Sequence, residues 1–243
     1  MSIYKSKAIV LHQIKYSETS IIAYLYTEQF GRIQALIKGA RKKEARIKSN
    51  LFQPLFLLDL ELYYNHKKNF QTIKEAHLNP LLLSIAENTT KKTISLFLAE
   101  VLYKVLKEEN SDKNLFSFIY NSVQIFDHLQ ENISNFHLCF LVHLTSYLGF
   151  YPAGSFSETN KYFDLLNGVF CKNAPIHNHF IDNESAYFFN KLLNSDIHFP
   201  YLENISGTKR FELLEKIINY YKIHFEGLGV IQSLEVLNDL YHD

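Results

Sequence analysis

Residues 21–48 read IIAYLYTEQFGRIQALIKGARKKEARIK, and this stretch decides the fold of the first third of the chain. Apolar and aromatic side chains recur at every second position of residues 21–27, which is the period of a β-strand. Residues 28–31 come next and are predicted to form a turn, because Gly31 readily takes a positive φ. Alternation then resumes in residues 32–38. The stretch therefore predicts a β-hairpin that runs directly into a basic segment.

The same period predicts three further strands before Pro80, over residues 8–15, 54–64 and 70–78. Together with the hairpin they make five short strands, and the longest gap follows the third. This spacing is typical of a small five-stranded Greek-key barrel of the OB type. An SH3-like barrel of five strands is the alternative that the pattern leaves open.

After Pro80 the apolar period changes to that of amphipathic helices. We predict helices over residues 94–105, 116–126, 136–148, 183–193, 208–221 and 233–240. Residues 150–182 contain two glycines and two prolines and are expected to be irregular. The predicted fold class is α+β: an N-terminal OB-type β-barrel domain (1–79), then an all-helical C-terminal domain (80–243) with an irregular insertion (150–182).

Charge is distributed unevenly along a chain that is neutral as a whole. Residues 32–48 hold seven Lys or Arg and one acid, and residues 1–74 hold 13 of the 25 basic residues but 5 of the 25 acids. Clustered cations neutralise phosphates and release counterions, which is the main source of sequence-independent affinity for nucleic acids. We therefore expect the β-domain to bind a polyanion, with a merely solvated loop as the alternative.

The candidate DNA-binding residues fall into three groups. The first is the basic segment itself: Arg32, Lys38, Arg41, Lys42, Lys43, Arg46 and Lys48. Lys15 and Tyr16 form the second, in the expected turn after the first strand, and Lys67 and Lys68 form the third, in the turn before the fifth. The chain has no Trp, so stacking on bases falls to Tyr and Phe, of which Tyr16 is the best candidate.

Other functional classes find little support in the sequence. Two cysteines cannot build a disulfide framework, and we see neither a signal peptide nor an apolar run of membrane-spanning length, so we expect a cytoplasmic protein without membrane contact. No nucleotide-binding glycine motif is present, and no cofactor is expected. Asp59 and Glu61 share a strand face and are the one candidate pair for a metal-dependent nuclease, although a polar outer face explains them as well.

Five segments of this chain, taken in order, resemble one known family. They are residues 16–19 (YSET), 27–32 (TEQFGR), 38–42 (KGARK), 148–152 (LGFYP) and 233–237 (SLEVL). Their order and spacing resemble the RecO family of bacterial recombination mediators, and the resemblance covers essentially the whole chain.

The resemblance implies an N-terminal OB domain, a helical C-terminal domain and no catalytic centre. It also implies binding to single- and double-stranded DNA and annealing of complementary strands, in association with the nucleoid. The implied partners are RecR and the single-stranded-DNA-binding protein, with which such a mediator loads RecA. The acidic, Phe-ended tail of the single-strand binder needs an apolar cleft with a basic rim, for which Lys104, Lys209 and Arg210 are candidates.

The sequence departs from the family at one place. Many members carry a four-cysteine zinc site after the helix that ends near Pro152, but residues 153–162 contain no C-x-x-C pair. Cys171, His177 and His179 are three ligands without a fourth, so we expect no bound metal. We expect aromatic and apolar side chains to hold the insertion together instead: Phe156, Tyr162, Phe163, Leu165, Phe170 and Phe180.

An OB-domain RNA-binding factor is the rival binding function that the residues leave open. Its contacts to the 2′-hydroxyl would separate it from a DNA binder in a competition assay.

Overall fold

The computed structural model describes residues 2–107 and 110–242. The chain forms two compact units, Met1–Asp127 and His128–Asp243. The first contains the five-stranded sheet and three helices, and the second contains four helices and a small sheet. The chain changes from strands to helices near residue 79, where we expected the two domains to divide. That this position is a domain boundary stays a prediction.

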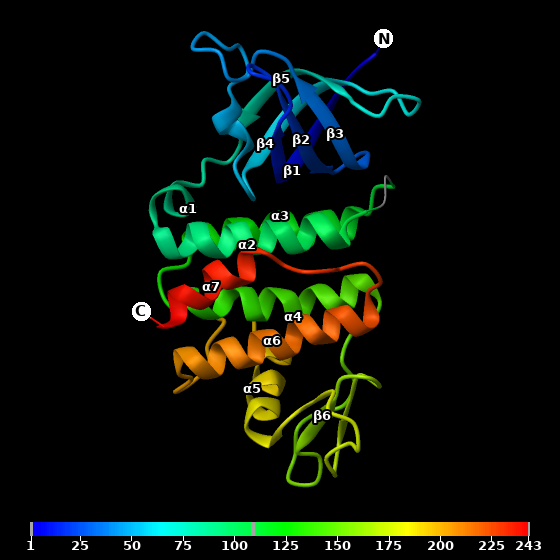
Figure 1. Ribbon diagram of the computed structural model, residues 1–243, viewed down its shortest axis with the longest axis vertical. Helices are drawn as coiled ribbons and strands as arrows, with labels where there is room; N and C mark the ends of the chain where they lie inside the picture. Colours follow the sequence, from blue (N-terminus) through cyan, green and yellow to red (C-terminus); the bar gives the residue numbers. More distant parts are fainter. Residues whose placement is uncertain (1, 108–109, 243) are drawn as a thin grey trace. The chain divides into compact units, whose positions relative to one another are not determined.

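Five antiparallel strands form the sheet of the first unit (Figure 1). In chain order they are β1 (Ile3–Lys15), β2 (Ile21–Thr27), β3 (Gly31–Ile37), β4 (Leu57–Tyr63) and β5 (Thr72–Leu78), and in the sheet they run β3-β2-β1-β4-β5. The long β1 is central, because its second half pairs with β2 and its first half with β4. All five predicted strands are therefore confirmed. Gly31 begins β3 with a φ of 61°, as the predicted hairpin requires.

The expected closed barrel is wrong in one respect, because the sheet does not close. Its edges, β3 and the residue before β5, meet at a single parallel bridge between Ala35 and Gln71. Gln71 N–H donates to Gln34 O (2.7 Å), and Leu36 N–H donates to Gln71 O (3.3 Å). The Gln71 side chain also donates to two carbonyls of the β4–β5 hairpin, which fixes Gln71 to that turn. The edges are therefore joined at one point and separate on both sides of it.

The core of the sheet follows from the alternation in its strands. In β3 the buried positions are Ile33, Ala35 and Ile37, while the residues between them are partly exposed. The 3-10 helix η1 (Ser49–Phe52) adds Phe52, which is fully buried in the same apolar cluster. Burying a phenylalanine side chain contributes roughly 1.5–3 kcal/mol.

Three helices complete the first unit: α1 (Leu83–Glu87), α2 (Thr89–Val105) and α3 (Lys113–His128). Asn88 caps α2 by accepting a hydrogen bond from Lys91 N–H. The Lys91 ammonium is only 1% exposed and donates to Ser84 Oγ and to Asp127 O, both at 2.8 Å. It therefore links all three helices, and burial lowers its pKa. The short α1 was not predicted, since five residues are too few to show a helical period.

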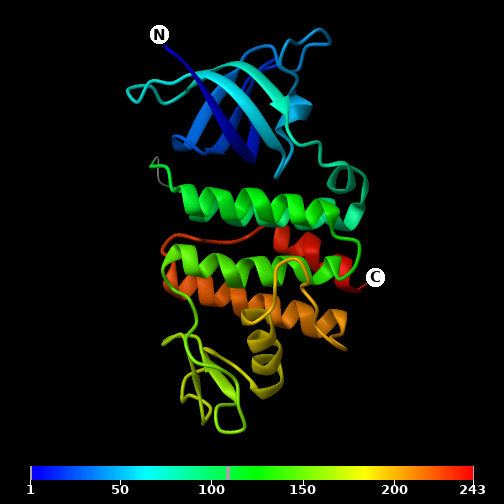
Figure 2. The ribbon, with the colours of Figure 1, turned by 180° about the vertical axis from the view of Figure 1, so that it is seen from behind.

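The second unit is built on α4 (Phe136–Leu148), α5 (Asn183–Leu193), α6 (Gly207–His224) and α7 (Ser233–His242). The helix α4 ends at Gly149, which takes a φ of 86°. Asp182 caps α5 and Ser206 caps α6 with their side chains. Figures 1 and 2 show α4 and α6 side by side, and the buried Tyr221 of α6 donates to Leu141 O of α4 at 2.6 Å.

The insertion is more regular than expected. Residues 150–182 contain a three-stranded sheet, in the order β7-β6-β8, made of β6 (Tyr162–Asp164), β7 (Val169–Cys171) and β8 (Phe180–Ile181). Strands of two or three residues are too short to show a period, and tertiary contacts place them. One such contact lies at Gly168, where a Cβ would come within 2.8 Å of the Tyr220 hydroxyl.

The expected apolar packing of the insertion is confirmed at its centre. Phe163 and Leu165 are fully buried, and the Phe163 ring lies 5.0 Å from that of Phe170 and 4.7 Å from that of Phe189 on α5. Phe156 and Tyr162 make ring contacts at the edges, with Tyr187 and Phe180.

The candidate metal ligands of the insertion have other partners. Cys171 Sγ donates to a main-chain carbonyl, His177 Nε2 lies 3.4 Å from the Asp164 carboxylate, and His179 Nδ1 lies 3.3 Å from the Asn219 amide. Among the described residues, no group of three or more His, Cys, Asp or Glu is placed to hold a metal ion. The residues present therefore do not fit the zinc site of the family. The described helices also include none that is long and apolar enough to cross a membrane.

Burial of His137 makes the stability of the second unit depend on pH. This side chain of α4 is fully buried, and burial with the nearby Arg210 lowers its pKa to about 3. A histidine in the unfolded chain takes up a proton near pH 6.5, so the unfolded state binds more protons between about pH 6.5 and 3. Stability should therefore fall as the pH falls through that window.

Lowering the pH from 7.5 to 5.5 should reduce the free energy of unfolding of both the wild type and His137→Gln. We predict that the reduction is about 1.4 kcal/mol larger in the wild type. Urea unfolding of both proteins at the two pH values measures this difference. Equal losses in the two proteins would show that His137 is not responsible.

Candidate nucleic-acid interface

The basic segment forms the loop between β3 and η1, here called the cationic loop (residues 38–48). Ala40 is buried and holds its base, because Ser49 N–H donates to Ala40 O at 2.9 Å. Gly39 takes a φ of 73°, and the bond from Lys42 N–H to Gly39 O closes a tight turn. The chain beyond this anchor is exposed. Six basic side chains point into solvent from one short loop: Lys38, Arg41, Lys42, Lys43, Arg46 and Lys48.

Two of the six cations are held by neighbours. The Arg41 guanidinium donates to Glu18 O in the β1–β2 loop at 3.1 Å, and Arg41 N–H donates to Thr19 O at 3.0 Å. Arg46 pairs with the Glu75 carboxylate at 2.9 Å, although its side chain stays largely exposed. The ammonium groups of the other four, all lysines, make no ion pair or hydrogen bond within the described part of the chain. The loop thus combines fixed arginines with lysines open to a ligand.

The β1–β2 loop brings Tyr16 to the same region. Tyr16 N–H donates to Ser20 O at 3.0 Å, which closes the loop and leaves the ring 59% exposed. Its ring centre lies 6.5 Å from that of Phe70, just before β5. Lys15 is exposed at the end of β1. The second predicted group therefore lies beside the cationic loop, to which Arg41 ties it.

A groove of about 600 Å³, here called the main groove, runs between the cationic loop and the start of β5. Lys38 and Arg46 line one wall, and Tyr63, Phe70 and Lys74 line the other. Its volume lies in the range of ordinary ligand sites. Cations next to aromatic rings are the combination that holds a single strand, because phosphates meet the charges and bases meet the rings.

The third predicted group lies on the β4–β5 hairpin, which projects from the sheet in both views (Figures 1 and 2). Asn65 starts the turn, with Oδ1 accepting from Lys67 N–H and O accepting from Lys68 N–H. Both lysine side chains are exposed. Figure 1 shows this hairpin and the cationic loop leaving the sheet in different directions, so the three groups do not form one cluster.

Arg32 is used differently from the other predicted residues. Its guanidinium donates to Tyr103 O (2.9 Å) and Leu106 O (3.1 Å) at the C-terminal end of α2, and lies 4.3 Å from the centre of the Tyr103 ring. A cation at this end of a helix also meets the negative end of its dipole. Arg32 therefore joins the sheet to α2, and we do not include it among the residues of the main groove.

The helices cover part of the sheet on which OB folds commonly bind their ligands. Tyr103 of α2 lies against His12 and Tyr24, with ring centres 5.2 and 5.0 Å away. Tyr26 is buried against Phe116 of α3. Burial lowers the pKa of His12. Of the outer side chains of β2, Ile22 and Tyr26 are buried and Tyr24 is half-buried, so little of this strand is open to bases. The packing of the helices on β2 was not predicted from the sequence. Phe70 and Lys74 were also not predicted, because long-range strand pairing brings them to the main groove.

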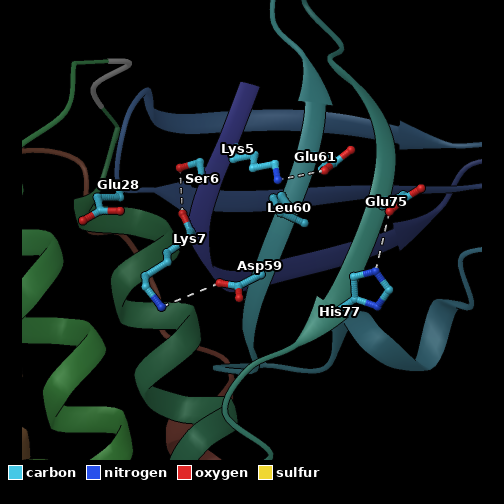
Figure 3. Close-up of a pocket in the computed structure, with 9 residues that line it drawn as sticks. All are labelled: Lys5, Ser6, Lys7, Glu28, Asp59, Leu60, Glu61, Glu75 and His77. Carbon is cyan, nitrogen blue, oxygen red and sulfur yellow. Dashed lines mark hydrogen bonds and ion pairs between the residues drawn. The ribbon is translucent and has the colours of Figure 1, made fainter. Parts of the chain in front are cut away.

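The candidate nuclease pair lies on the outer face of β4, around a separate pocket of about 380 Å³ (Figure 3). Asp59 pairs with Lys7 at 3.7 Å, and Glu61 pairs with Lys5 at 3.5 Å. Lys74 also donates to Glu61 at 2.7 Å, and this bond lowers the pKa of that carboxyl. These are cross-strand ion pairs of an outer face, and this arrangement gives the nuclease function no support.

Comparison with known proteins identifies the family. The family model "Recombination protein O N terminal" matches residues 1–80, and the family model "Recombination protein O C terminal" matches residues 86–230. The chain belongs to the RecO family. The resemblance read from the sequence is thereby confirmed, and the two matches meet close to Pro80, where strands give way to helices.

Curated relatives match nearly the whole chain. The "DNA repair protein RecO" of Azobacteroides pseudotrichonymphae is 35% identical, over 98% of this chain and 99% of the relative. The proteins of the same name from Bacteroides fragilis and Flavobacterium psychrophilum are 36% and 32% identical, each over 98% of both chains. The likeness to these family members therefore includes both compact units.

We predict that Arg32→Met destabilises the first unit by about 2 kcal/mol, since two charge-assisted hydrogen bonds and a contact with an aromatic face are lost. Urea unfolding measures the change. Lys43→Met is the matched control, because the side chain of this exposed lysine has no partner among the described residues and its loss should change stability by less than about 0.5 kcal/mol. Equal unfolding midpoints for the two variants would contradict the role given to Arg32.

Proposed function

We propose that this protein acts in DNA repair and recombination by binding single- and double-stranded DNA without sequence preference through the cationic loop and the main groove. The observation that carries the proposal is the exposure of six cations on one short loop, beside a groove with aromatic walls. Family membership supports DNA as the polyanion. The RNA-binding alternative has no comparable support.

The arrangement favours phosphates over bases as the main contacts. Lysines on an exposed loop attract any phosphate backbone, and such contacts carry no sequence information. Among the described aromatic residues of the first unit, Tyr16 is the most exposed, so stacking on its ring adds affinity for single strands without reading their sequence. The proposed residues are Lys38, Arg41, Lys42, Lys43, Arg46 and Lys48, with Lys15, Tyr16, Lys67 and Lys68 around them.

Annealing of complementary strands follows from the same chemistry. Two strands repel each other through their phosphates, and a cationic surface that both can approach lowers this repulsion while their bases remain free to pair. The proposed role includes helping to load RecA, with RecR, on strands coated by the single-stranded-DNA-binding protein. This part of the proposal comes from the family resemblance.

The suggested basic rim for the acidic tail of the single-strand binder gains no support from the geometry. Lys209 pairs with Glu184 and Glu212, Arg210 donates to Asn135, and Lys104 lies 3.6 Å from Glu100. All three cations thus have partners within the chain. We therefore propose the tail and RecR as partners without assigning their sites.

The function is tested by strand annealing with complementary oligonucleotides coated by the cognate single-stranded-DNA-binding protein. The wild type should accelerate duplex formation at moderate salt, and a variant without the cations of the loop should not. If the wild type fails to bind DNA or to accelerate annealing, the proposed function is wrong.

We predict that the triple variant Arg41→Gln, Lys42→Gln, Lys43→Gln binds all single strands more weakly, and by the same factor for each sequence. The slope of log affinity against log salt concentration should be less steep by about 2. Each of the three lost phosphate contacts removes about 0.7 from this slope. Fluorescence anisotropy with oligothymidylate and a mixed-sequence strand measures both effects.

The matched control for the triple variant removes three other exposed lysines of the first unit, Lys5, Lys92 and Lys113, by changing them to Gln. This control has the same net charge as the triple variant of the loop, but it keeps the proposed phosphate contacts. Its salt slope should therefore stay near that of the wild type. An equal loss in the two triple variants would mean that total charge matters and the loop does not.

We predict that Tyr16→Ser weakens single-strand binding by about 1–3 kcal/mol, the value of one stacked base, and affects duplex binding much less. Tyr201→Ser is a suitable control, because that ring is 58% exposed and lies in the second unit. Titration of both variants with single strands and duplexes of equal length makes the comparison. An equal effect on both forms of DNA would argue against stacking by Tyr16.

A further inference from the structure

The open edge of the sheet creates a second cavity. On one side of the bridge between Ala35 and Gln71 lies the main groove, and on the other lies a cavity of about 150 Å³, here called the hairpin pocket. Gln71 lines both. The hairpin pocket is formed by the first half of β3, by the β4–β5 hairpin and by the residue at position 107, and all of these belong to the first unit.

The lining of the hairpin pocket is suited to an anion. Arg32, His66, Lys68 and Lys107 contribute to its walls, and none of its nine lining residues is acidic. The volume is well below the roughly 300–1,000 Å³ of sites that enclose whole small molecules. A single phosphate group is the chemical unit that matches both the charge and the size.

The main chain and one charge of the hairpin pocket are held in place before any ligand arrives. The Gln71 amide donates to Asn65 O (3.1 Å) and Lys68 O (2.9 Å), which fixes the main chain of the hairpin. Arg32 is fixed by its two bonds to α2, and a charge that is already positioned loses little entropy when it binds a ligand. The Lys68 ammonium has no ion pair or hydrogen bond within the described residues, so it is open to a ligand.

The outward residues of β3 connect the two cavities. Arg32 and Gln34 line the hairpin pocket, while Leu36 and Lys38 line the main groove. Alternate residues of a strand share one face, and six residues of strand span about 20 Å. That length corresponds to about six stacked nucleotides at 3.4 Å each, or to fewer in an extended strand. One single strand can therefore follow β3 past the bridge and reach both cavities.

We propose that the hairpin pocket binds a phosphate group of the same nucleic-acid strand that lies in the main groove, with Lys68 as its main ligand. The inference rests on the proposed function and adds a second phosphate site beyond the cationic loop. It also separates Lys68, which lines the pocket, from the adjacent Lys67, which does not.

The test compares Lys68→Gln with Lys92→Gln, which remove the same charge from two exposed lysines of the first unit, and Lys92 lines neither cavity. Both side chains are exposed and the hairpin is held by main-chain and Gln71 bonds, so both variants should fold. We expect Lys68→Gln to bind oligothymidylate about 3- to 10-fold more weakly at low salt, with a salt slope lower by about 0.7. Lys92→Gln should stay within about twofold of the wild type.

A second pair of variants adds a charge in place of removing one. Gln34→Glu places a carboxylate in the lining of the hairpin pocket with little change of shape, and Gln53→Glu adds the same charge at an exposed position that lines neither cavity. We expect Gln34→Glu to weaken binding at least as much as Lys68→Gln, and Gln53→Glu to have a much smaller effect.

Failure of this inference and failure of the proposed function give different results. If the wild type binds DNA, the triple variant of the cationic loop is weakened and Lys68→Gln binds DNA as tightly as Lys92→Gln, the phosphate site in the hairpin pocket is wrong and the proposed function stands. The same conclusion holds if Gln34→Glu and Gln53→Glu bind DNA equally well. Equal affinities are the result expected if the pocket binds an acidic peptide and not DNA. If the wild type does not bind DNA, both proposals are wrong.

Discussion

Two backbone hydrogen bonds, from Gln71 N–H to Gln34 O and from Leu36 N–H to Gln71 O, control the shape of the candidate interface. They join the sheet edges at one point, while the Gln71 side chain keeps that residue attached to the hairpin turn. A continuous ladder between β3 and β5 would satisfy more backbone groups, but it would bring the edges to within about 5 Å and leave no room between them. The single bridge leaves a cavity on each side, and the charges gather around these two openings.

The helices of the first unit have a comparable influence, because they decide which part of the sheet remains open. Tyr103 packs against His12 and Tyr24, and Arg32 is bound by the last carbonyls of α2. The outer edge of β3 and its loops are therefore more open than β2 to the proposed ligand. The cation at Arg32 keeps some influence on the hairpin pocket, since a residue bonded through one side of its guanidinium still contributes its full charge to the cavity that it lines.

Local patterns predicted what depends on local physics. The period of two in residues 21–37 determines both the strands and which side chains enter the core, so β2 and β3 could be predicted closely. The amphipathic pattern of residues 136–148 and the glycine after it likewise predicted α4. The six exposed cations of the cationic loop were also predictable, because a short segment so rich in charge cannot be buried.

What escaped prediction depends on contacts between distant parts of the chain. Arg32 looked like the other members of the basic segment, but its partners are more than seventy residues away at the end of α2. Phe70 and Lys74 joined the main groove through strand pairing, and the short strands of the insertion were placed by packing on α5 and α6. The sequence pattern also suggested closure of the barrel, yet the side-chain bonds of Gln71 hold its end of the hairpin at a single point.

The two compact units carry opposite net charges, although the chain as a whole is neutral. The first unit holds 18 basic and 12 acidic residues and the second holds 7 and 13, so their net charges are +6 and −6. At physiological salt the field of a charge is screened within about 8 Å, so the charges closest to a phosphate determine how strongly the phosphate is attracted. The negative net charge of the second unit makes the surface of that unit unfavourable for a polyanion. Because the chain has no net charge to attract a polyanion from a distance, the proposed affinity for DNA depends on direct contact with the loop and the two cavities.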